Sequence, residues 1–172
     1  MRLRRRRSGF TLLELVVVVC LVAIFASVAL DRLLRYQEIA EKAAVEATIG
    51  VIQSALTVQV AVRIPRTGLS ALEALSQENP FDWLAKLPPG YLGVRHQPRV
   101  ADLPGASWYF DLKNKEIGYK PQRTRFFAAA GDEPLLRYRV VVRITTNAAT
   151  GLAELSELGI ARVDRASWAP EF

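Results

Sequence analysis

Residues 4–30, RRRRSGFTLLELVVVVCLVAIFASVAL, determine how the rest of the sequence is interpreted. The stretch opens with four arginines, Arg4–Arg7, and becomes an apolar run that is broken only by Ser27 between Leu15 and Leu30. With the residues just before it, the run is long enough to cross about 30 Å of hydrocarbon as a helix. Glu14 is the exception, because a carboxylate is costly in such a setting. Since basic residues favour the cytoplasmic side, the pattern predicts a single-pass anchor whose C-terminal remainder is exported.

The positive charge of the protein is concentrated at this end. The formal net charge is +6, and Arg2 and Arg4–Arg7 supply five of the 23 basic residues. The other basic residues nearly balance the 17 acidic ones, so the remaining chain lacks the general electrostatic footprint of a polyanion-binding protein. A length of 172 residues with 51% hydrophobic residues predicts one ordinary folded domain in addition to the anchor.

The N-terminal run differs from a cleavable secretory signal. No small-x-small site ends it, because Asp31 and Arg32 follow directly, and the small residue Gly9 lies before the run. Cys20, the only cysteine, lies within the run and is interpreted as an apolar packing residue, so no disulfide within the chain is expected.

A single long helix is predicted from residue 10 to about residue 62. The first proline is Pro65, so a helix on the order of 80 Å long is possible. From residue 31 to residue 62 the pattern becomes amphipathic, with one apolar stripe at helical spacing, formed by Val45, Ile49, Ile52, Leu56 and Val60. One face of this second half therefore needs a cover.

Residues 63–172 are expected to supply that cover. Residues 69–87 are interpreted as a loop with short helical turns, and 88–90 as a turn. Strands are predicted at 107–112, 116–120, 136–145 and 159–163, the first two joined as a hairpin. The predicted fold class is α+β, with the long N-terminal helix packed on a small antiparallel sheet.

The residues needed for an enzyme, a cofactor or a metal centre are not found together. His96 is the only histidine, which excludes metal sites built from several histidines. The sequence has neither a glycine-rich phosphate loop nor the loop pattern of an EF-hand. We therefore expect no catalytic residues, no cofactor and no metal.

The hexapeptide Gly9-Phe10-Thr11-Leu12-Leu13-Glu14 resembles the class III signal of the type IV pilin family, which includes the pseudopilins of type II secretion. The resemblance implies a pilin-like fold. It also implies that a prepilin peptidase removes the leader, residues 1–9, by cutting between Gly9 and Phe10, and that the new amino group of Phe10 is methylated. Residues 10–30 would then be the transmembrane and filament-core helix, residues 31–62 its continuation, and residues 63–172 a periplasmic domain.

The resemblance also gives Glu14 a partner. Cleavage creates a charged amine at Phe10, and the Glu14 carboxylate can pair with it within one chain or with the amine of a neighbouring subunit. The intersubunit pairing is the one that the family uses. An inner-membrane platform and other pilin or pseudopilin subunits would be the remaining partners. Many pilins of this family carry a glycine and a proline in the membrane helix, and major pilins often carry a C-terminal cysteine pair. This sequence has neither feature, and the comparison with the family therefore favours a minor pilin or pseudopilin over a major subunit.

Two functions are compatible with these features. The first is structural: a subunit of a type IV pilus or of a type II secretion pseudopilus. The alternative is a minor or tip pilin whose exported domain binds DNA, a surface or a secreted substrate. The candidate residues for that binding are nine arginines: Arg63, Arg66, Arg95, Arg99, Arg123, Arg125, Arg137, Arg139 and Arg143. Clustering of several on one face would favour DNA binding, whereas pairing with acids would favour the structural role.

Overall fold

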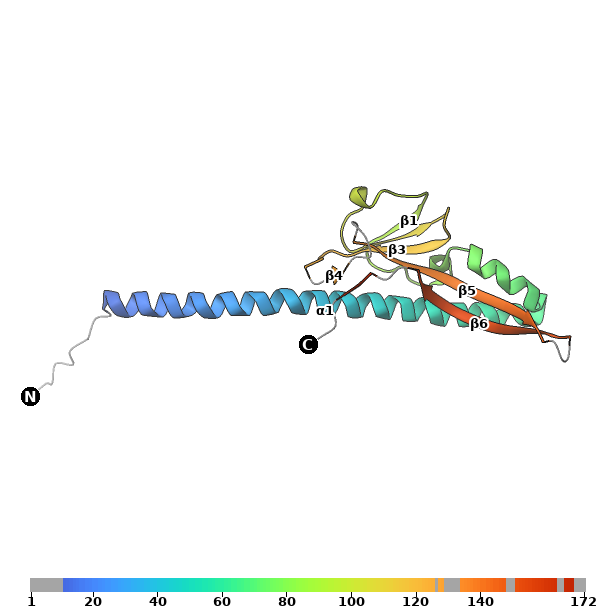
Figure 1. The fold of residues 1–172 in the computed structure, drawn as a ribbon, viewed down its shortest axis with the longest axis horizontal. Helices are drawn as coiled ribbons and strands as arrows, with labels where there is room; N and C mark the ends of the chain where they lie inside the picture. Colours follow the sequence, from blue (N-terminus) through green and yellow to red (C-terminus); the bar gives the residue numbers. More distant parts are fainter. Residues whose placement is uncertain (1–10, 126, 129–133, 148–150, 164–165, 169–172) are drawn as a thin grey trace, which may run out of the picture. The chain divides into compact units, whose positions relative to one another are not determined.

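The computed structural model describes residues 11–125, 127–128, 134–147, 151–163 and 166–168. The chain divides into two compact units, one up to Ile39 and one from Ala40 onward, and each is described by itself. Helix α1 (Leu12–Thr67) contains residues of both units and confirms the predicted long helix (Figure 1).

Helix α1 ends five residues later than expected. Pro65 lies inside its last turn, and the helix continues to Thr67 instead of stopping near residue 62. A proline this close to the end removes one intrahelical hydrogen bond without interrupting the turns before it. The helix stops at Gly68, whose N–H donates to the carbonyl of Ile64 (3.1 Å) and whose φ of 74° lies in the left-handed region that glycine tolerates.

The first unit exposes an apolar helix surface in every direction. Residues 11–33 are all exposed, including Leu13, Val19 and Phe25. Within the described part of the chain, α1 is the one helix that is long and apolar enough to cross a membrane. An apolar surface all round is typical of a helix that lipid or other helices cover.

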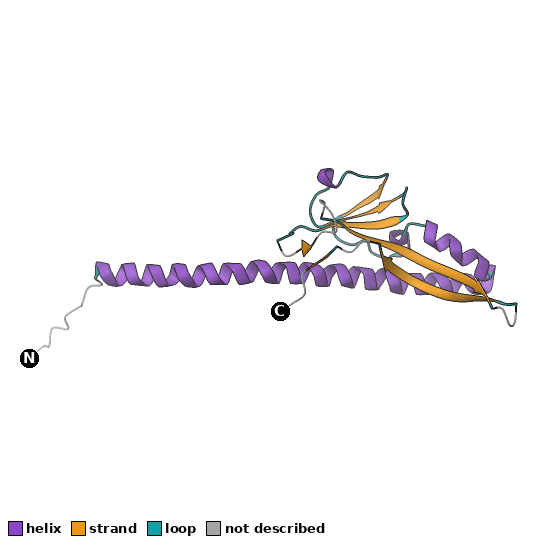
Figure 2. Ribbon diagram, viewed as in Figure 1, coloured by secondary structure: helices purple, strands orange, loops and turns teal. Residues whose placement is uncertain are grey.

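The second unit contains a five-stranded sheet (Figure 2). Its strands, in spatial order, are β1 (Tyr91–Arg95), β2 (Ser107–Asp111), β3 (Glu116–Lys120), β5 (Leu136–Thr146) and β6 (Ala153–Arg162). Neighbours are antiparallel except β1 and β2, which are parallel. A separate two-stranded sheet joins β4 (Phe127–Ala128) to β7 (Ser167–Trp168).

The comparison with the predicted strands is mixed. The hairpin of β2 and β3 and the long strand β5 are confirmed. The sheet is mostly, not wholly, antiparallel, because the unpredicted strand β1 adds a parallel edge. Strand β6 begins at Ala153, six residues before the predicted start at residue 159. The first half of the strand was missed because it is mostly exposed and its sequence is polar, which is not typical of a strand.

The short helical turns expected between residues 69 and 87 are present as two 3-10 helices, η1 (Leu69–Gln77) and η2 (Pro80–Trp83). A further 3-10 helix among the described residues, η3 (Val100–Asp102), was not predicted. Asn79 caps η2, because its side-chain oxygen accepts the N–H of Phe81 (3.2 Å).

The core of the second unit lies between α1 and the sheet. On the helix it uses the predicted stripe, of which Val45, Ile52, Leu56 and Val60 are buried and Ile49 is partly buried. One cluster joins Val45 and Ile52 to sheet and loop residues, namely Phe81, Trp108, Phe110, Ile117, Tyr119 and Leu136. A second cluster joins Leu56 and Val60 to Leu72, Leu75 and Val140. Each large buried side chain contributes about 1.5–3 kcal/mol, so this stripe fixes the helix to the sheet.

Candidate assembly site at the start of helix α1

Thr11 sets the start of α1. Its hydroxyl oxygen accepts the N–H of Glu14 (3.2 Å), and its carbonyl accepts the N–H of Leu15 (3.1 Å). These two bonds make Thr11 the N-cap residue and Glu14 the third residue of the helix. The spacing Thr-x-x-Glu is the sequence signature of a capping box. This signal was not used in the sequence analysis, because roles there were assigned only to Gly9, Phe10 and Glu14.

The Glu14 carboxylate lies in the first turn, at the positive end of the helix dipole, where an anion is stabilised. It is exposed, and it is the only charged side chain between residues 11 and 30. Ser27, the other polar residue of the apolar run, satisfies its hydroxyl internally by donating to the carbonyl of Ile24 (2.8 Å). Among residues 11–39, no described side chain pairs with the carboxylate. Gly9 and Phe10 lie outside the described residues.

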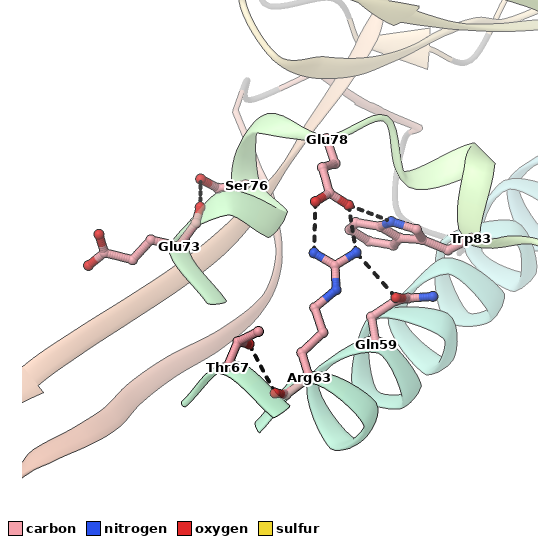
Figure 3. Close-up of polar contacts among 7 residues, drawn as sticks. All are labelled: Gln59, Arg63, Thr67, Glu73, Ser76, Glu78 and Trp83. Atoms are coloured by element: carbon pink, nitrogen blue, oxygen red, sulfur yellow. Dashed lines mark hydrogen bonds and ion pairs between the residues drawn. The ribbon is translucent and has the colours of Figure 1, made fainter. Parts of the chain in front are cut away.

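The nine candidate arginines between residues 63 and 143 do not all remain available for a ligand. Arg63 donates to both carboxylate oxygens of Glu78, at 2.7 and 2.9 Å (Figure 3). Arg139 pairs with the buried Glu116 (2.5 Å), and Arg143 pairs with Glu157 on the neighbouring strand (3.2 Å). By the criterion stated above, these three pairs favour a structural role for the arginines.

The Arg63–Glu78 pair is the centre of a larger polar cluster. Trp83 donates its indole N–H to Glu78 (3.1 Å), and Arg63 also donates to the side chain of Gln59 (3.3 Å) (Figure 3). The hydrogen bond from Arg63 holds the pKa of Glu78 below its usual range, and the hydrogen bond to Glu78 raises the pKa of Arg63. The cluster therefore ties the last turns of α1 to the segment between η1 and η2.

The remaining potential ligand residues form no metal centre in the described part of the chain. No three His, Cys, Asp or Glu side chains there come together as metal ligands would. His96 is exposed in the loop after β1, and Cys20 is exposed on the apolar helix.

Comparison with known proteins identifies the N-terminal segment. Residues 4–30 match the family model of the prokaryotic N-terminal methylation motif, which is the class III signal of type IV pilins and pseudopilins. Searches of curated proteins and of solved structures returned no match. The motif precedes and overlaps the long apolar helix of an α+β, pilin-like architecture. Motif and fold together support a pilin-like subunit that is processed as a prepilin and anchored by this helix.

Proposed function

We propose that this protein is a minor pilin or pseudopilin of a type IV pilus or a type II secretion system. Prepilin peptidase cleaves between Gly9 and Phe10, and the amino group of Phe10 is then methylated. Before assembly the subunit lies in the inner membrane, with its N-terminus in the cytoplasm and residues 63–172 in the periplasm. The observation that carries the proposal is the match of residues 4–30 to the methylation motif.

In this proposal Glu14 is the assembly carboxylate. A charged residue at the centre of a bilayer costs about 2.5–3.5 kcal/mol, and less near the end of a helix, so the subunit can still insert. The cost nevertheless favours a partner, and the amine of Phe10 on a neighbouring subunit provides one. The exposed position of Glu14 beside the Thr11 cap supports this role, because the cap uses the Glu14 N–H and not its carboxylate.

The pairing of Arg63, Arg139 and Arg143 with acids supports the structural function over the alternative of a DNA-binding or substrate-binding tip subunit. A DNA-binding surface would need these cations directed at phosphates, and an arginine that is held by a carboxylate contributes little net charge.

Mass spectrometry of the mature N-terminus tests the processing step. The expected product is a chain that begins at methylated Phe10. An intact leader, or a chain cut beyond Leu30, would contradict the proposal.

Substitution Glu14→Ala tests the assembly carboxylate. The variant should insert and be processed like the wild type but enter filaments poorly, as measured by immunoblotting of sheared filaments against the membrane fraction. Ser27→Ala is the matched control, because it removes the other polar side chain of the run without removing a charge, and it should assemble normally. Normal assembly of Glu14→Ala would remove the proposed role of the carboxylate.

A further inference from the structure

We draw no further inference here: the strongest candidate, the uncharged outer face of α1 between residues 47 and 62 with its exposed Val51, Val58 and Val62, carries none because nothing in the structure shows what covers it.

Discussion

At the scale of single residues, Arg63 donates hydrogen bonds to both Glu78 and Gln59 near the end of α1. The substitution Arg63→Met removes these bonds, and the Glu78 carboxylate then keeps the hydrogen bond from the Trp83 indole N–H. Because both partners are partly exposed, we expect a loss of about 1–2 kcal/mol in the free energy of unfolding and not the larger cost of a buried pair. Chemical denaturation of the full chain in detergent, followed by tryptophan fluorescence, measures it. Arg66→Met, at an exposed position without such a pair, should change stability little.

The same pair predicts an acid dependence. Arg63 lowers the pKa of Glu78 in the folded protein, so when the pH falls below about 4.3, the ordinary pKa of glutamate, the unfolded chain takes up the proton first. The stabilisation by Glu78 is therefore present above that pH and is lost as the pH falls through the folded-state pKa. Unfolding measured from pH 6 downward should show a smaller decline for Glu78→Gln than for the wild type. Parallel curves for the two proteins would contradict this.

Tyr119 predicts the opposite dependence. Its hydroxyl donates to Glu41 (2.8 Å), and burial, with this hydrogen bond and the nearby carboxylate, raises its pKa. As the pH rises above about 10, the unfolded chain loses the phenolic proton first, so this part of the stability is lost with increasing pH. We expect Tyr119→Phe to cost about 1 kcal/mol at neutral pH and to reduce the alkaline decline. An alkaline decline as steep as that of the wild type would contradict it.

At the scale of elements, the β2–β3 hairpin depends on the absence of a side chain at one position. Gly118 pairs with Tyr109 across the hairpin, and a Cβ at Gly118 would overlap the Tyr109 ring. Tyr109 is 4% exposed and has little room to move, so Gly118→Ala should destabilise by about 3 kcal/mol. Gly159→Ala in β6 is the control, because its Cβ would meet only Gln53 Oε1 at 3.8 Å. Similar denaturation midpoints for the two variants would refute the steric argument.

The elements also explain what the sequence could predict. The hairpin and β5 were predictable because aromatic and β-branched residues are concentrated in them. Strand β1 was not, because a glycine and a shift in register interrupt its five residues. The two-residue strands β4 and β7 are too short to leave a pattern. The ion pair of Arg63 depends on Glu78, fifteen residues away, being brought back by η1, and no local spacing specifies that.

At the start of α1, in contrast, the candidate residues could be chosen from local sequence spacing. Gly9, Phe10 and Glu14 were selected from a sequence pattern, and their roles remain predictions; residues 4–30, which contain them, match the methylation motif as a whole. The Thr-x-x-Glu spacing at Thr11 is a capping signal that was not used in the sequence analysis. The hydrogen bond from the Glu14 N–H to the Thr11 hydroxyl oxygen identifies Thr11 as the N-cap of α1.

At the scale of the whole molecule, the two units differ in where their apolar surface lies. In the first unit it is exposed around the helix up to residue 33, whereas every buried apolar side chain of the two core clusters belongs to residues 45–166. Among the described residues, both core clusters therefore lie wholly in the unit from Ala40 onward. A chain that begins at Ala40 should be soluble without detergent and should unfold in one cooperative transition.

The unfolding transition of the fragment that begins at Ala40 can be measured by far-ultraviolet circular dichroism and by the near-ultraviolet signals of its buried aromatic residues. The comparison is Leu56→Ala in the same fragment, which leaves a cavity beside Val60 and Leu72 and should lower the free energy of unfolding by about 2–5 kcal/mol. A fragment that aggregates, or that melts without a transition, would show that residues before Ala40 are needed for folding. The helix would then serve the domain as well as the membrane, and substitutions such as Glu14→Ala could not be interpreted as affecting assembly alone.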